Sequence, residues 1–400
     1  MHADRVVSGM RPTGAMHLGH YHGALKNWIK LQSEFPCLFF VADWHALTTH
    51  YEDPSIIESS TWDMVIDWLA AGIDPVKATI FIQSQVPEHA ELHLLLSMAT
   101  PLGWLERVPT YKDQQEKLAD RDLATYGFLG YPLLQAADVL IYRASQVPVG
   151  ADQIPHIEMM REIARRFNHL YGKEKGFEQK VEEALKKLGG KQAKQYGELR
   201  NAYQEQGSEE ALERAKALLD EAKSIGAADR ERLFGYLAGT RKQILPEPQA
   251  RLTESSRLPG LDGQKMSKSY GNSIALREDR ESVTKKIRTM PTDPARVRRS
   301  DPGNPEKCPV WQLHLVYSDQ ATRDWAYQGC TTAGIGCIEC KQPVIDAVLK
   351  EQEPMRERAQ QYLDQPQLVR EIVAQGCASA RKLAGETMRE VREAMGLSYR

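Results

Sequence analysis

The chain has 400 residues, 42% of them apolar, and a formal net charge of −2. This length and composition allow large buried cores and favour two or three domains. The small net charge excludes a global attraction to nucleic acid, so any such site must be a local basic patch. No apolar run approaches the roughly 20 residues that span a bilayer, and no signal-peptide pattern opens the sequence. We therefore expect a cytoplasmic protein with no membrane segment, in which disulfides are unfavourable.

The first 150 residues alternate short apolar runs with helical patterns. The predicted strands are residues 5–9, 37–43, 78–82 and 147–149. The helical patterns cover residues 18–31, 54–69 and most of 88–145. This alternation predicts an α/β fold with a parallel sheet and helices on its faces, although it leaves the strand order open.

The composition changes at residues 170–245, where Lys, Glu, Ala and Gln dominate and aromatic residues are few. This segment predicts a solvated helical insertion, and nothing in it requires chemistry. Helix-breaking residues return between Pro246 and Gly260. From Pro309 onward helical patterns dominate, with a long amphipathic stretch over residues 368–395.

The first of two short motifs, His17-Leu18-Gly19-His20, lies where a predicted strand turns into a helix. A helix N-terminus presents unpaired N–H groups and the positive end of its dipole to an anion. Gly19 removes a side chain where a nucleotide could approach, and the two histidines share a helical face. By itself, this motif could equally be a turn with two solvated histidines.

The second motif, Lys265-Met266-Ser267-Lys268-Ser269, follows Gly260 and Gly263. A mobile loop with two ammonium groups, closing as pyrophosphate leaves, stabilises the transition state more than the ground state. Alone it could be an exposed charged loop, but the two motifs in this order predict a nucleotide site. Its predicted catalytic residues are His17, His20, Lys265 and Lys268.

Two longer segments lie between these motifs, Tyr131–Asp138 and Val147–Glu158. With the short motifs, they resemble bacterial tryptophanyl-tRNA synthetases, which are class I aminoacyl-tRNA synthetases. The match runs through most of residues 5–170 and resumes at 255–400. The longer segments are far more specific than the short motifs.

The resemblance implies a Rossmann-like catalytic domain over residues 1–169, with a helical dimer-interface insertion at about 88–130. A helical insertion then occupies residues 170–250, and residues 251–284 complete the catalytic domain. Residues 285–400 correspond to a helical anticodon-binding domain. The resemblance also implies a homodimer.

The activity implied by the resemblance is that of a tryptophan–tRNA ligase. ATP and L-tryptophan, with Mg²⁺, give tryptophanyl-adenylate and pyrophosphate, and the acyl group then passes to tRNA(Trp). Because the substrate carboxylate attacks the α-phosphorus, the protein supplies alignment and charge neutralisation, and no nucleophilic side chain is needed.

The resemblance also assigns residues that contact tryptophan. Asp138 matches the acceptor of the indole N–H, and a carboxylate left unpaired by a phenyl ring would discriminate against that ring. Tyr131 and Gln153 match residues that hold the ammonium group. The other implied pocket residues are Val7, Gly9, His45, Gln135, Val147 and Val149.

A further set of positions matches the ATP contacts of the family. These are Arg11, Pro12, Thr13, Gly19, His20, Gly150, Ala151, Asp152, Leu258, Lys265, Met266, Ser267, Lys268 and Ser269. Three positions depart from the pattern, because Arg11, Gln135 and Ala151 stand where many relatives have Gln, Met and Glu. The effect of these departures is left open.

Four of the six cysteines lie within 33 residues. They are Cys308, Cys330, Cys337 and Cys340, with the spacing C-x21-C-x6-C-x2-C. Four thiolates with one close pair can hold either zinc or a [4Fe–4S] cluster, and ligand number alone does not separate these. A subset of tryptophanyl-tRNA synthetases resembles this spacing and carries [4Fe–4S], which favours that cofactor over structural Zn²⁺ or unliganded thiols.

The strongest local basic patch comprises Lys285, Lys286, Arg288, Arg296, Arg298 and Arg299. It is either a solvated face or a set of contacts to tRNA phosphates. Three other functions compete with the tryptophan enzyme. These are a tyrosine–tRNA ligase, because Gln135 and Asp138 could serve a phenol, an iron–sulfur redox or RNA-binding regulator, and a nucleotidyltransferase of related fold.

Overall fold

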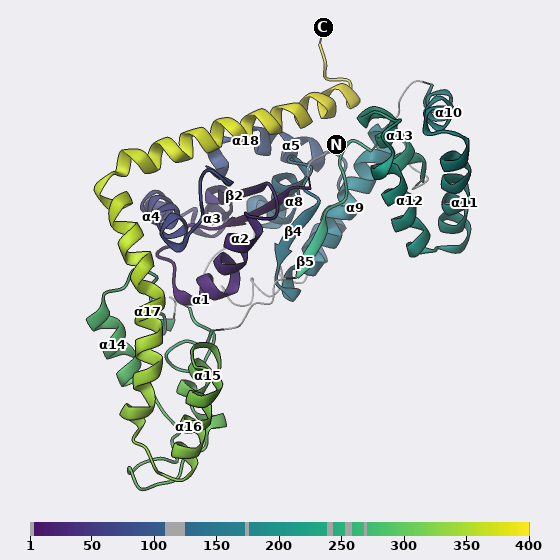
Figure 1. Ribbon diagram of the computed structural model, residues 1–400. Coiled ribbons are helices and arrows are strands. Elements are labelled where there is room, and N and C mark those ends of the chain that lie inside the picture. The colour runs from purple at the N-terminus through teal and green to yellow at the C-terminus, as the bar shows by residue number, and fades with distance from the viewer. Residues whose placement is uncertain are drawn as a thin grey trace. The chain divides into compact units, whose positions relative to one another are not determined.

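The computed structural model describes residues 4–108, 125–172, 176–237, 243–252, 258–267 and 270–399. The chain divides into two compact units. The first unit comprises Met1–Ser8, Gln83–Arg251 and Cys377–Arg400, and the second comprises Gly9–Ile82 and Leu252–Gly376. Figure 1 shows the elements of both units along the chain.

The strands form a five-stranded sheet with the order β3-β2-β1-β4-β5. β1 (Val6–Met10) pairs in parallel with β4 (Gln146–Val149), and β2 (Cys37–Val41) pairs in parallel with β3 (Ala78–Ile82). All five residues of β2 are buried, as expected for a parallel strand covered on both faces. The α/β prediction is confirmed, and the edge strand β5 (Gln249–Leu252) was not predicted.

In the second unit, the predicted helix after β1 is interrupted by a π-helical turn. It comprises α1 (Leu18–His20), η1 (Tyr21–Leu25) and α2 (Lys26–Leu31). Such π-turns occur frequently at functional sites. They arise from one extra residue in a turn, which an apolar pattern does not reveal.

The same unit has an aromatic core between its helices and strands. The next two helices of this unit are α3 (Asp43–His50) and α4 (Ser55–Ala71), and α4 contributes to this core. The Trp28 ring stacks on Phe39 at 4.3 Å between centroids and meets Trp68 edge-on at 5.3 Å. All three side chains are buried, so α2 and α4 are fixed against β2 by aromatic packing.

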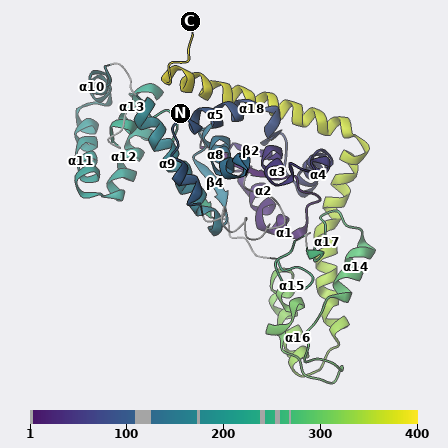
Figure 2. The same ribbon diagram turned by 180° about the vertical axis from the view of Figure 1, so that it is seen from behind.

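The later part of the second unit is helical, as predicted. Its elements are α14 (Arg280–Thr289), η5 (Pro305–Lys307), α15 (Pro309–Tyr317), α16 (Gln320–Thr331) and α17 (Cys337–Asp364), after which α18 (Pro366–Ala394) begins. α17 packs against α4, α14 and α15 (Figure 2). Although α17 and α18 have 28 and 29 residues, no helix in the described parts of the chain is long and apolar enough to cross a membrane.

The first unit contains several helices besides its strands. They are η2 (Gln83–Gln85), α5 (Glu88–Ser97), α6 (Leu102–Glu106), α8 (Tyr126–Leu140), η3 (Ala151–Gln153) and α9 (Ile154–Tyr171). α8 packs against α5 and α9. The prediction that residues 88–145 are mostly helical is confirmed where they are described, and residues 109–124 lie outside the described residues.

The insertion of the first unit is a helical bundle with its own apolar core. Its helices are α10 (Phe177–Leu188), α11 (Gly190–Gln206), α12 (Glu209–Glu221) and α13 (Ala227–Leu237). The core includes Phe177, Val181, Leu219 and Leu233, and the Tyr196 hydroxyl donates to the Leu233 carbonyl at 2.6 Å. The composition predicts solvated helices, and the structure shows that these helices also pack around a buried core of their own.

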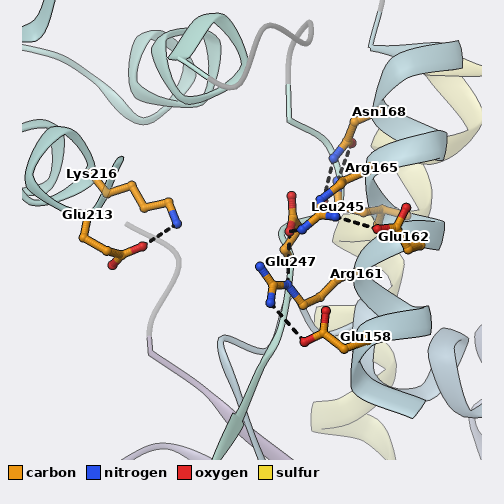
Figure 3. Close-up of polar contacts among 9 residues, drawn as sticks. All are labelled: Glu158, Arg161, Glu162, Arg165, Asn168, Glu213, Lys216, Leu245 and Glu247. Atoms are coloured by element: carbon orange, nitrogen blue, oxygen red, sulfur yellow. Dashed lines mark hydrogen bonds and ion pairs between the residues drawn. The ribbon is translucent and has the colours of Figure 1, made fainter. Parts of the chain in front are cut away.

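The segment leaving this bundle is fixed to α9 by one buried amide (Figure 3). Asn168 Nδ2 donates to the Leu245 carbonyl at 2.7 Å, and its Oδ1 accepts from the N–H groups of Ile244 and Leu245 at 2.8 and 3.0 Å. Glu247 adds ion pairs to Arg161 and Arg165 at 3.2 and 2.8 Å. Because these groups satisfy the backbone just before β5, they determine where the chain re-enters the sheet.

Candidate nucleotide and amino-acid sites

The His17–His20 turn follows β1 in the second unit. The two imidazole rings stack with centroids 3.7 Å apart, and His17 is buried whereas His20 is exposed. A Cβ at Gly19 would lie 2.9 Å from the His17 ring and 3.2 Å from Met266 Cβ. Glycine is therefore required because two side chains press against the backbone here.

Backbone hydrogen bonds join this turn to the segment that follows the second motif. Leu18 N donates to the Ile274 carbonyl at 2.9 Å, and Leu276 N donates to the Met16 carbonyl at 3.0 Å. Gly19 N lies 3.3 Å from Met266 Sδ, although the two residues are 247 positions apart. The structure thus brings the two predicted motifs into contact.

A buried ion pair supports this junction from α4. Asp67 is 2% exposed, accepts a hydrogen bond from Met16 N at 3.2 Å and pairs with the Arg277 guanidinium. Burial raises the pKa of Asp67, and the charge of Arg277 opposes that rise. Asp67 therefore binds both paired segments. Met16 lies directly before His17 in the first segment, and Arg277 lies directly after Leu276 in the second.

One buried asparagine organises the Lys265 loop. Asn272 Oδ1 accepts from Ser267 N at 2.7 Å, and its Nδ2 donates to the Lys265 carbonyl at 3.1 Å. A Cβ at Gly260 would lie 2.3 Å from this amide, so only glycine fits there. Met266 is buried beneath the loop while Lys265 is exposed, which leaves the ammonium group available to a ligand.

Other predicted nucleotide residues lie around the same turn or the same loop. Arg11 and Thr13 are exposed directly after β1, with Pro12 buried between them. Leu258 and Lys265 line one cavity beside the loop. Lys268 and Ser269 lie outside the described residues. Exposed cationic side chains near a helical turn form an arrangement that can bind a polyanion.

The first unit contains a buried polar network around Asp138. Asp138 Oδ1 accepts from Gln83 Nε2 at 2.7 Å and lies 2.7 Å from His89 Nδ1. His89 Nε2 in turn lies 2.6 Å from the Tyr142 hydroxyl. Sequence reasoning identified Asp138 but missed the other three residues, although Gln83 follows a buried strand directly, where a polar residue is a functional signal.

The remaining predicted pocket residues of the first unit lie on α8, β1 and β4. Tyr131, Gln135 and Asp138 are spaced by four and three residues on α8, so they share one face. Val7 and Val147 are buried on the paired strands β1 and β4. Val149 and Gln153 are half-buried. Between them, the predicted ATP contacts Ala151 and Asp152 are exposed and Gly150 is half-buried.

Two predicted pocket residues belong to the second unit. A Cβ at Gly9 would lie 2.5 Å from the Phe40 ring, so packing alone already requires glycine at this position. His45 is 8% exposed and lies on α3. Gly9 itself is exposed whereas His45 is buried, and their contact with an amino acid stays a prediction.

The four predicted metal ligands lie close together in the helical part of the second unit. Cys308 precedes α15, Cys330 lies on α16, and Cys337 and Cys340 lie in the first turn of α17. Burial, together with the charges of the other three thiols, raises the pKa of Cys340 to about 12. However, no group of three or more His, Cys, Asp or Glu among the described residues is arranged to hold a metal ion.

The surroundings of these thiols fit an anionic group. Arg296 is 9% exposed, lies beside Cys330, and its Nε has no hydrogen-bond partner within the described parts of the chain. Lys341 is 3% exposed and donates to the carbonyls of Arg288 and Met290. Two buried cations beside four thiols are compatible with a tetrathiolate metal site, since metal binding replaces the thiol protons.

The predicted basic patch divides into structural and exposed members. Lys286 pairs with Glu278 at 2.6 Å, and Arg296 is buried. Lys285, Arg288 and Arg298 are exposed. Only the exposed members are therefore available to an anionic partner.

Comparisons with known proteins identify the family of this chain. The family model described as tRNA synthetases class I (W and Y) matches residues 2–195 and 231–351. The chain belongs to this family. The resemblance predicted from the motifs is confirmed, and the gap in the match falls inside the helical bundle of this class I synthetase.

Individual relatives support the same assignment. A tryptophan–tRNA ligase of Ralstonia nicotianae is 72% identical over 399 residues, covering 100% of both chains. One from Thermotoga maritima is 44% identical over 397 residues, covering 99% of this chain and 100% of the relative. A crystal structure of tryptophanyl-tRNA synthetase from Campylobacter jejuni, complexed with ADP and tryptophan, has a TM-score of 0.73 at 28% identity and covers 98% of this chain and 100% of that one.

Loosening the Lys265 loop should impair catalysis without unfolding the protein. Asn272→Ala removes the hydrogen bonds that hold Lys265 and Ser267, and we expect amino-acid-dependent ATP–pyrophosphate exchange to slow by about tenfold. Gln264→Ala is the matched control, because that exposed side chain lies in the same loop. Equal exchange rates in both variants and the wild type would contradict the organising role of Asn272.

Proposed function

We propose that the protein is a tryptophan–tRNA ligase. It activates L-tryptophan with ATP to tryptophanyl-adenylate, releasing pyrophosphate, and then transfers the tryptophanyl group to tRNA(Trp). The observation that carries this proposal is the 72% identity, along the whole chain, to a tryptophan–tRNA ligase. The contact between the His17–His20 turn and the Lys265 loop supports it, because both motifs are needed at one nucleotide.

In the activation step, the carboxylate of tryptophan attacks the α-phosphorus and pyrophosphate leaves. The N–H groups of the turn at α1, with His17 and His20, stabilise the phosphate oxygens as negative charge shifts. Lys265, and Lys268 in the same loop, neutralise the departing pyrophosphate. Mg²⁺ enters with ATP as the counter-ion of its phosphates. These groups align and neutralise, so the chemistry needs no covalent enzyme intermediate.

The indole ring is proposed to lie against α8, with its N–H donating to Asp138. Tyr131 and Gln135 share that helix face, and Val7 and Val147 supply buried apolar walls. Tyr131 and Gln153 hold the ammonium group of the substrate. A buried carboxylate is costly without a donor, so a phenyl ring in this position is disfavoured.

The cysteine site is proposed to hold a [4Fe–4S] cluster, with structural Zn²⁺ as the alternative. Cys308, Cys330, Cys337 and Cys340 would be its four thiolate ligands, and the cluster would contribute a compact anionic centre to the helical region. The exposed Lys285, Arg288 and Arg298 would contact tRNA phosphates. We further propose that the enzyme acts as a cytoplasmic homodimer.

Amino-acid specificity separates this proposal from the tyrosine enzyme of the same family. We expect ATP–pyrophosphate exchange to be supported by L-tryptophan and not by L-tyrosine at equal concentration, because the pocket acceptor pairs with an indole N–H. Charging of tRNA(Trp) should then reach one tryptophan per tRNA. Faster exchange with tyrosine, or RNA binding without exchange, would overturn the assignment.

Metal analysis tests the cysteine site independently of activity. Anaerobically purified protein should contain about four irons and four sulfides per chain and absorb visible light, and Cys337→Ser should lose both. Cys377→Ser is the control, because Cys377 is buried outside the group and contacts Gln85. Colourless wild-type protein with stoichiometric zinc would favour the alternative, and metal-free protein would contradict both.

A further inference from the structure

We propose that three buried side chains position the Asp138 carboxylate and thereby set the preference of the enzyme for a substrate with an indole N–H. They are Gln83, His89 and Tyr142. This inference rests on the proposed role of Asp138 as the indole acceptor. It adds positioning residues to that role, since none of the three was assigned to the site by the sequence motifs.

The network is closed to solvent. Asp138, Gln83, His89 and Tyr142 are each 0% exposed. They come from three separate elements, because Gln83 begins η2, His89 lies on α5, and Asp138 and Tyr142 lie on and just after α8. A carboxylate so deeply buried is stable as an anion only when donors surround it.

Two donors converge on one carboxylate oxygen. Gln83 Nε2 and His89 Nδ1 both lie 2.7 Å from Asp138 Oδ1. An ionised carboxylate offers about four acceptor positions, so it can serve both donors and a substrate N–H as well. Holding one oxygen in two directions prevents rotation of the group, which keeps the other oxygen in a constant place.

Tyr142 hydrogen-bonds to the second ring nitrogen of His89. In neutral imidazole one nitrogen donates and the other accepts, and Nδ1 faces the acceptor Asp138. His89 Nε2 is then the acceptor for the Tyr142 hydroxyl, at 2.6 Å. Burial raises the pKa of Tyr142 well above its usual value, so this hydroxyl keeps its proton.

One further polar atom of the network faces away from Asp138. Gln83 donates to Asp138 through Nε2, which turns its Oε1 the other way, and that oxygen is buried without a partner among the described residues. A buried acceptor without a donor is unfavourable. A donor such as an N–H group or an ordered water is therefore favoured beside Gln83 Oε1.

The consequence concerns selectivity more than rate. When its orientation is fixed, Asp138 binds a substrate with an N–H more tightly than a substrate without one. A substrate without the N–H leaves the carboxylate with one hydrogen bond fewer. Without the His89 donor the carboxylate can rotate. It then no longer distinguishes the two substrates, even though the pocket can still hold the ring.

The test compares L-tryptophan with its analogue in which sulfur replaces the indole N–H, using ATP–pyrophosphate exchange. We expect the ratio of kcat/KM for the two substrates to fall by about tenfold in His89→Leu, mainly through KM for tryptophan. KM for ATP should stay unchanged. His89→Asn keeps an N–H near the position of Nδ1 and should recover part of the ratio.

Tyr142→Phe removes a single oxygen and serves if His89→Leu does not fold. It should lower the ratio by about threefold, the effect of one weakened hydrogen bond. The positioning role is overturned if these variants slow both substrates equally and leave the ratio unchanged. Asp138→Ala separates the two proposals. If Asp138→Ala leaves the ratio of kcat/KM for the two substrates unchanged, Asp138 is not the indole acceptor. If the ratio falls in Asp138→Ala but not in the His89 and Tyr142 variants, only the positioning role of the network is rejected.

Discussion

The pairing of Met16–Leu18 with Ile274–Leu276 is the interaction on which the proposed nucleotide site depends. The two segments are far apart in the sequence, so their pairing closes a long loop. Closing such a loop costs conformational entropy, which local contacts must offset. Backbone hydrogen bonds, the Gly19–Met266 contact and the buried Asp67–Arg277 pair supply that compensation. The second unit therefore brings the two motifs into contact, as the proposed nucleotide site requires.

A related constraint operates in the first unit, where the Asp138 carboxylate is fully buried. Asp138 is acceptable there because Gln83 and His89 donate to it. In the proposed role of Asp138 as the indole acceptor, the same burial makes the carboxylate selective, because a missing donor is unfavourable. Stability and specificity thus depend on one set of hydrogen bonds, which explains why glutamine, histidine and tyrosine side chains occur in an otherwise apolar core.

The sequence predicted the strands well for a physical reason. Parallel strands covered on both faces are continuous apolar runs, as in residues 37–41, and such runs stand out from the polar segments around them. β5 was missed because Gln249–Leu252 is short, largely exposed and polar. The π-turn at residues 21–25 leaves no trace in the apolar pattern. The core of the insertion was hidden because its small and aliphatic residues alternate with many Lys and Glu.

The candidate site was predictable in part. The two short motifs predicted a nucleotide site, and the structure brings them into contact. The amino acid and its pocket came from the family resemblance, because the side chains that contact an indole follow no spacing rule. Gln83 and His89 escaped notice because their partner is far away in sequence, and only the fold brings α5 to α8.

The most direct test of the account is a crystal structure of the protein with L-tryptophan and a non-hydrolysable ATP analogue. The account predicts the indole N–H within hydrogen-bonding distance of Asp138. It also predicts the phosphates bound by the His17–His20 turn and the Lys265 loop. An indole ring bound elsewhere, with Asp138 making no contact to it, would contradict the account.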